Sequence, residues 1–271
     1  MRAWTADLAL PGSVEPGPPA LVVRAVRKAF RAAGAELDAL RSLSLSVGRG
    51  ELVCLVGPSG CGKSTLLRLA AGLLEPTEGA IEVQGQPPDA ARRGKRIGYV
   101  PQEAALLPWR TALGNVALAL EVNPRPAQGD AGPAAEAALR RVGLGGFERH
   151  YPHQLSVGMR QRVALARALV LEPSLMLLDE PFAALDELTR EAMRYELLSL
   201  WSRDRPAVLF VTHSVAEAVA LAERVLVLSA RPGRVDGEVL IRLPRPRTPE
   251  MERSPAFLAA EDQVRALLRP T

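Results

Sequence analysis

The sequence predicts an α/β fold in which helices cover a mostly parallel β-sheet. Short apolar runs of strand length alternate along its 271 residues with longer helical patterns, as expected for parallel strands joined by helices. A glycine-rich loop joins one of these apolar runs directly to a helix. Ahead of this loop, alternation between apolar and polar residues predicts a smaller antiparallel sheet.

The N-terminal part of the chain is predicted to form a flexible leader and then this small sheet. Residues 1–20 are rich in proline and glycine, which indicates an extended or disordered leader. Residues 21–26 and 43–47 alternate between apolar and polar side chains, so both segments are predicted strands. Phe30 lies between them. We expect an N-terminal antiparallel β subdomain beside the main sheet.

The glycine-rich loop lies between a predicted strand at residues 52–56 and a predicted helix at residues 66–71. It consists of Gly57, Pro58, Ser59, Gly60, Cys61, Gly62, Lys63, Ser64 and Thr65. Such a loop directs successive backbone N–H groups into one hollow, and the following helix adds partial positive charge there. We expect Lys63 to bind the outer phosphates of a nucleotide and the Ser64 hydroxyl to bind Mg²⁺. The alternative, a glycine-rich turn that binds nothing, leaves the lysine, the hydroxyl and both flanks unexplained.

The middle of the chain is predicted to add two strands and a helical insertion. Residues 79–83 and 96–100 have strand patterns, and the second ends shortly before Gln102. Beyond this glutamine, alanine, leucine and charged residues dominate in helix-like stretches. We therefore predict an α-helical subdomain inserted at about residues 103–165.

The remaining part of the domain continues the alternation of strands and helices. Ser156 is placed to cap a helix that runs to about residue 171. Further predicted strands are residues 174–178, 207–212 and 224–229, and further predicted helices are residues 187–201 and 214–222. Residues 21–240 thus form the predicted main domain. Residues 241–271, which end in a helical pattern, are predicted to be a C-terminal extension.

Polar residues follow two of these apolar strands. Asp179 and Glu180 end one strand, and His213 ends the next. In a phosphate-binding α/β protein, an acid at a strand end helps to hold Mg²⁺, and a neighbouring acid can deprotonate an attacking water. Ligands of open α/β sheets gather at the carboxyl ends of strands, where Gln102 also falls. Paired acids are also ordinary turn residues, and a single histidine at a strand end is often structural.

These motifs together resemble the ATP-binding subunits of ABC transporters, a family with a P-loop NTPase core. The resemblance covers about residues 21–240. The matching positions are Phe30 for the adenine-stacking aromatic residue, 57–65 for Walker A, Gln102 for the Q-loop, 155–159 for the signature loop, 175–180 for Walker B, 184–186 for the D-loop and His213 for the switch histidine. Apart from Phe30, these are six motifs in the family's order, which are far more specific than a phosphate-binding loop alone.

The resemblance implies that the cofactors are ATP and Mg²⁺. It assigns catalytic roles to Glu180, His213 and Gln102, and it implies that Ser64, Gln102 and Asp179 bind the metal. It also implies that two copies of the chain pack head to tail around ATP. Further nucleotide contacts would then come from Ser156, Gly158 and Asp186.

The resemblance also implies membrane partners. The expected partners are a second copy of the chain, transmembrane permease subunits and, indirectly, a periplasmic or extracellular solute-binding protein. The permease would dock on the helical subdomain, which places this chain on the cytoplasmic face of the cell membrane as a peripheral subunit. A narrower resemblance, carried by residues 106–109, 115–116 and 229–235, is to importers of nitrate, sulfonates and taurine. Trp109 in this pattern is equally compatible with a plain hydrophobic anchor.

One position departs from the family pattern. The signature loop usually contains Leu-Ser-Gly-Gly, but Val157 replaces the first of these glycines. A β-branched residue does not readily adopt a backbone conformation that requires glycine. If this position is an ordinary helix start, the change is mild; if a phosphate must approach it closely, turnover is slow.

The composition is compatible with a cytoplasmic protein that does not bind nucleic acid. The net charge is +4, but the arginines are scattered rather than clustered. No apolar run has the length of a membrane span, and we expect no signal peptide. Cys54 and Cys61 do not imply a disulfide framework. Two alternatives are a soluble ABC-type ATPase that acts on nucleic acid or ribosomes, and a small-molecule kinase, which would leave the signature, Q-loop and switch residues without roles.

Overall fold

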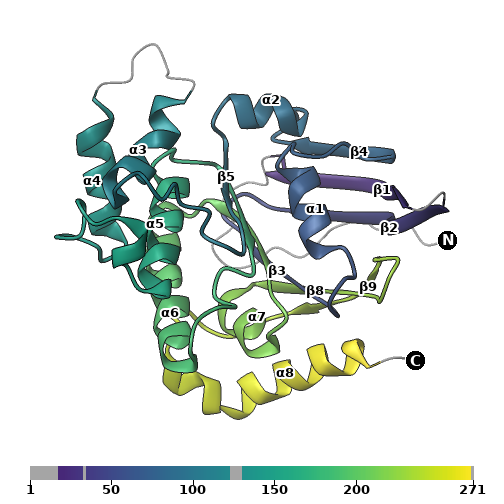
Figure 1. Ribbon diagram of the computed structural model, residues 1–271. Coiled ribbons are helices and arrows are strands. Elements are labelled where there is room, and N and C mark those ends of the chain that lie inside the picture. Colours follow the sequence, from purple (N-terminus) through teal and green to yellow (C-terminus); the bar gives the residue numbers. More distant parts are fainter. Residues whose placement is uncertain (1–17, 33–34, 123–129, 270–271) are drawn as a thin grey trace.

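The computed structural model describes residues 18–32, 35–122 and 130–269. The leader that we predict at residues 1–20 lies almost entirely outside the described residues. The described part has two sheets, with helices around the larger one (Figure 1). The predicted α/β fold is confirmed.

The larger sheet has the strand order β5-β6-β7-β3-β8-β9. Neighbouring strands are parallel from β5 to β8, and β9 runs antiparallel to β8. The bounds are β3 (Leu52–Val56), β5 (Ile97–Val100), β6 (Leu175–Asp179), β7 (Ala207–Val211), β8 (Arg224–Leu228) and β9 (Val235–Leu240). Every residue of β3, β6 and β7 is buried, because packed side chains cover both faces of the sheet.

The N-terminal antiparallel sheet has the order β2-β1-β4, formed by β1 (Leu21–Ala32), β2 (Ala35–Val47) and β4 (Glu78–Val83). Its first two strands extend beyond the predicted segments, so Phe30 lies within β1 and pairs with Leu37. Charge pairing supports the extension. Arg27 donates hydrogen bonds to Asp38 at 2.9 Å and to Glu36 at 3.0 Å, both on β2.

Helix α1 (Lys63–Ala70) packs between the two sheets, and a short helix, α2 (Pro88–Arg93), follows β4. Three further helices pack against one another at the side of the larger sheet (Figure 1). They are α3 (Ala112–Glu121), α4 (Ala131–Arg141) and α5 (Val157–Leu169). Each is capped at its N-terminus by a side-chain oxygen, from Thr111, Asp130 and Ser156 respectively.

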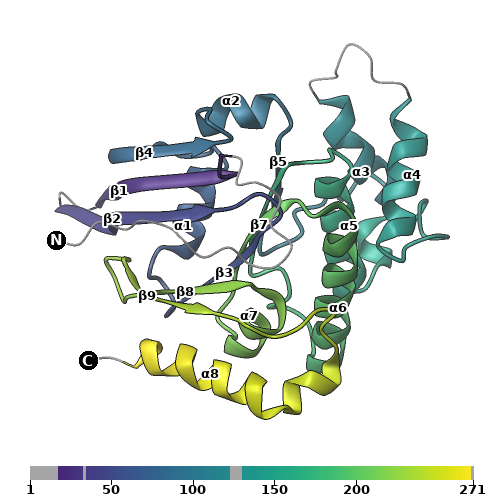
Figure 2. The same cartoon turned by 180° about the vertical axis from the view of Figure 1, so that it is seen from behind.

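The C-terminal segment packs against the core through α7 (Val215–Leu221). Buried Arg247 donates hydrogen bonds to the carbonyl oxygens of Val219, Ala220 and Ala222 at the end of α7. After a short 3-10 helix (Pro249–Arg253), α8 (Pro255–Leu268) runs beneath α7 and β9 (Figure 2). The remaining helix is α6 (Glu187–Asp204). Among the described residues, none of the helices combines the length and the apolar character that a membrane crossing requires.

Candidate functional site

The glycine-rich loop curls around the amine of Lys63. Lys63 is 5% exposed, and its Nζ donates hydrogen bonds to the carbonyl oxygens of Gly57 at 2.7 Å and Pro58 at 3.0 Å. Gly62 is required at its position, since its φ is 101° and a Cβ would lie 2.6 Å from Leu40 Cδ2. The loop therefore holds a positive charge at the start of α1, where a helix N-terminus also favours anions.

Of the remaining loop residues, those next to the strand and the helix are buried or partly buried, and those at the tip are exposed. Cys61 is buried, and burial raises the pKa of its thiol. A Cβ on Gly57 would lie 3.0 Å from Cys61 Sγ. Pro58, Ser59 and Gly60 are exposed at the tip, where a ligand can reach their backbone. Thr65 follows in α1 and is partly buried.

Ser64 and Asp179, predicted to hold Mg²⁺, lie together although they are far apart in the sequence. Ser64 Oγ donates a hydrogen bond of 2.8 Å to Asp179 Oδ1. The Tyr99 hydroxyl lies 3.4 Å from the other carboxylate oxygen, a contact that the sequence analysis missed. Asp179 is 3% exposed, and burial raises its pKa.

These two oxygen donors fit a magnesium ion that is delivered with a nucleotide. Hydroxyl and carboxylate oxygens are the ligand types that Mg²⁺ prefers, and this ion usually completes its shell with water and substrate phosphates. In the described part of the chain, no group of three or more His, Cys, Asp or Glu side chains is placed to hold a metal ion. Ser64 and Asp179 would thus supply only part of the coordination shell of the ion.

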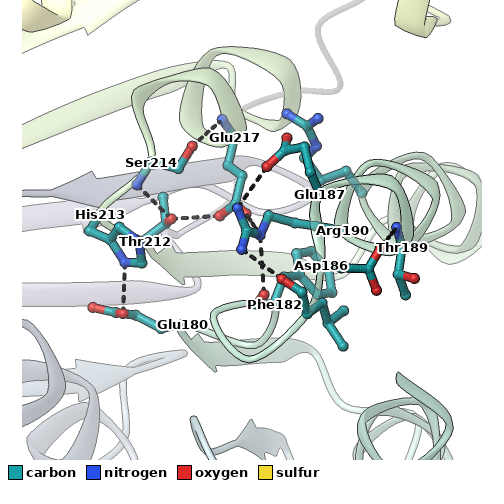
Figure 3. Close-up of polar contacts among 12 residues, drawn as sticks. Glu180, Phe182, Asp186, Glu187, Thr189, Arg190, Thr212, His213, Ser214 and Glu217 are labelled. Carbon is teal, nitrogen blue, oxygen red and sulfur yellow. Dashed lines mark hydrogen bonds and ion pairs between the residues drawn. The ribbon is translucent and has the colours of Figure 1, made fainter. Parts of the chain in front are cut away.

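Glu180 and His213 meet at the ends of the adjacent strands β6 and β7. His213 Nδ1 lies 2.9 Å from Glu180 Oε2 (Figure 3). The backbone of Glu180 has a φ of 44°, a left-handed conformation that is uncommon for residues other than glycine and is found at functional sites. Its N–H donates to the carbonyl oxygen of Val211 at 3.0 Å, which fixes the turn after β6 against β7.

Gln102 and Phe30 lie on other elements. Gln102 is exposed and follows β5, the neighbour of β6 at the sheet edge. Phe30 is 41% exposed on β1, and the Lys28 Nζ lies 5.3 Å from its ring centroid. The aromatic ring therefore has a surface that a planar ligand can stack on.

The signature residues begin helix α5. Exposed Ser156 is the N-cap and accepts a hydrogen bond of 3.2 Å from the N–H of Met159. A Cβ on Gly158 would lie 3.3 Å from Thr189 Cγ2, so the starts of α5 and α6 are close together. Asp186 caps α6 by accepting a 3.0 Å hydrogen bond from the N–H of Thr189, and this backbone hydrogen bond lowers its pKa.

Val157 occupies an ordinary helix start. It is the first residue of α5 and is 45% exposed, so the conformation does not require glycine. We expect Val157→Gly to leave the maximal ATPase rate within about twofold, while lowering stability by about 0.5–1 kcal/mol through the higher chain entropy of glycine. Steady-state ATPase assays and thermal melts of both proteins measure these effects. A sharp loss of activity would contradict this interpretation of the loop.

Together, the fold and this site define a P-loop nucleotide hydrolase. Comparison with known proteins identifies the family within this class. The sequence profile described as "ABC transporter" matches residues 40–183. The chain therefore belongs to the ABC transporter ATP-binding family, and as such it is an ATPase coupled to transport.

Named relatives cover most of the chain. An ABC transporter ATP-binding protein of Methanocaldococcus jannaschii is 47% identical over 84% of each chain. The nitrate import ATP-binding protein NrtD of Synechocystis sp. is 44% identical, covering 85% of this chain and 88% of the relative. The aliphatic sulfonates import ATP-binding protein SsuB 2 of Burkholderia cenocepacia is 44% identical, covering 85% of this chain and 81% of the relative.

A solved structure has the same fold. It is described as the dimeric, post-hydrolysis state of the ATP-binding cassette MJ0796 bound to ADP and phosphate. Its TM-score is 0.74 at 35% identity, covering 82% of this chain and 99% of the other.

Proposed function

We propose that this chain is the ATPase subunit of an importer for nitrate, sulfonates, taurine or a similar small solute. The proposal rests on the site first, because Glu180 and His213 lie 2.9 Å apart at the carboxyl ends of β6 and β7, where Asp179 also contacts Ser64 of α1. The relatives named for nitrate and sulfonate import support the cargo class. The cargo is inferred by analogy with these relatives.

In this proposal, ATP binds with its phosphates in the loop around Lys63 and its adenine on Phe30. Ser64, Asp179 and Gln102 hold Mg²⁺, which offsets the charge of the phosphates when it is bound. Glu180 orients and deprotonates the attacking water. In this proposal, His213 Nδ1–H donates a hydrogen bond to Glu180 Oε2 and so orients the carboxylate toward the water.

A second copy of the chain completes the site. Ser156 is exposed at a helix N-terminus, a place suited to the γ-phosphate of a nucleotide bound to the other copy. Gly158 and Asp186 belong to the same surface, since α5 and α6 begin side by side. The dimeric MJ0796 cassette supports this arrangement. Loss of the γ-phosphate would then let the copies separate.

The membrane partners bind the helical subdomain at about residues 103–165. Trp109 is 71% exposed, which fits a docking contact better than an anchor in the core. Motion would pass to the permease through the segment after Gln102. The chain then acts as a peripheral subunit on the cytoplasmic face, fed by a solute-binding protein, with residues 21–240 as the ATPase domain and 241–271 as an extension.

Uptake of labelled nitrate, taurine and an alkanesulfonate in a strain that lacks this chain tests the proposal. We expect uptake of at least one of these solutes to be lost, and restored by the wild-type gene but not by Glu180→Gln. Unchanged uptake of all three solutes would contradict the cargo class. Stimulation of the purified ATPase by DNA or RNA, instead of by the permease, would favour the nucleic-acid alternative.

A further inference from the structure

A buried carboxylate that the proposed chemistry does not use lies behind the switch histidine. Glu217 on α7 is 5% exposed, and burial raises its pKa. Its Oε2 accepts a hydrogen bond of 2.6 Å from the Thr212 hydroxyl. The same hydroxyl accepts a 3.0 Å hydrogen bond from the N–H of Ser214. The residues on both sides of His213 are therefore bonded to one another and to α7 (Figure 3).

Arg190 on α6 connects this carboxylate to the loop after Glu180. Its Nε lies 3.8 Å from Glu217 Oε1 and donates a 3.3 Å hydrogen bond to the carbonyl oxygen of Phe182. Its Nη2 donates to the carbonyl oxygen of Leu185 at 2.7 Å. One guanidinium thus binds both the loop and the acid on α7, a geometry that the fixed fork of arginine allows (Figure 3).

These contacts form a closed ring. Glu180 contacts His213, whose neighbour Thr212 donates to Glu217. Glu217 pairs with Arg190, which binds the loop that begins directly after Glu180. The ring therefore joins α6 and α7 to the segments that carry Glu180 and His213, although only one of its contacts joins the carboxylate to the imidazole directly.

We propose that Thr212, Glu217 and Arg190 are positioning residues that hold Glu180 and His213 in the geometry for hydrolysis. The inference rests on the proposed roles of these two residues. Binding of ATP by the Lys63 loop does not pass through the ring. Loss of a ring contact therefore lowers kcat while the KM for MgATP stays nearly constant.

The test uses the full-length chain and a matched pair of variants at one position. Thr212→Val removes the hydroxyl at nearly constant volume, and Thr212→Ser keeps it. We expect Thr212→Val to lower kcat about tenfold, because small displacements of reacting groups carry costs of this order. Thr212→Ser should retain most of the activity. Equal kcat values for the two variants would overturn the proposal.

Glu217→Gln should give a similar loss of kcat, and its effect should not add to that of Glu180→Gln. Once the base is removed, its position no longer matters, so additive effects would contradict the inference. Glu187→Gln is the matched control. Glu187 also pairs with Arg190, at 2.9 Å, but its side chain is 72% exposed and lies outside the ring.

The measurements distinguish two ways in which the inference can fail: a purely structural role of these residues, or a failure of the proposed function itself. Thermal melts identify variants that unfold, and kcat is expressed per nucleotide-binding site. If kcat per site and KM are unchanged while only the melting temperature falls, the residues are structural and the proposal is wrong. If the wild-type chain itself does not hydrolyse ATP, the proposed function fails, and this inference fails with it.

Discussion

Glu180→Gln is expected to reduce ATP hydrolysis at least about 100-fold while ATP still binds, because a positioned general base contributes about 10²–10⁴ in rate. Glutamine keeps the size of the side chain but cannot accept the proton of the attacking water. The residues expected to hold the phosphates, Lys63 and the loop tip, are untouched. Steady-state phosphate release and binding of a fluorescent ATP analogue measure the two effects separately.

The same variant should accumulate a dimer in the presence of MgATP. If the γ-phosphate links Ser156 of one copy to the loop of the other, a chain that cannot hydrolyse ATP remains closed. Size-exclusion chromatography with and without MgATP detects the change. Glu136→Gln, on the exposed surface of α4, is the control and should remain monomeric. A normal hydrolysis rate for Glu180→Gln would show that this residue is not the base.

The sequence predicted the inner strands of the larger sheet well because they are buried on both faces. The runs that form β3, β6 and β7 are almost entirely apolar, and helical patterns separate them. Edge and exposed strands carried a weaker signal. In β9, aspartate, glycine and glutamate interrupt the apolar pattern, and only Val239 is buried. The charged extensions of β1 and β2 become a strand pair only through contacts such as that of Arg27 with Asp38.

The site residues were predictable where they follow buried strands or form the glycine-rich loop. Their local pattern already specifies the chemistry, and the parallel sheet brings the strand ends together. The supporting contacts were not predictable in this way. Tyr99 near Asp179, and Arg190 near Glu217, join residues on different elements, and no periodicity within either element indicates the partner.

Lys63→Ala is expected to weaken ATP binding by at least about 100-fold, since charged hydrogen bonds contribute about 1.5–3 kcal/mol each. The reason is visible in the loop, where Nζ already lies within hydrogen-bond distance of the carbonyl oxygens of Gly57 and Pro58. A phosphate bound in the hollow would lie against this ammonium. Removal of the side chain takes away both the counter-charge and the contacts that hold the loop closed.

Comparison with Lys63→Arg separates charge from shape. The chain has only the lysines Lys28, Lys63 and Lys95 among its 34 basic residues, so a lysine in the loop is not a consequence of general usage. A planar guanidinium is too wide for a hollow shaped around a compact ammonium, so we expect Lys63→Arg to bind ATP weakly as well. Melting temperatures with and without MgATP provide the measurement, because a ligand that binds the folded state raises the melting temperature. If MgATP raises the melting temperature of Lys63→Ala as much as that of the wild type, the phosphates bind elsewhere. A variant that is merely less stable is recognised by its lower melting temperature without nucleotide.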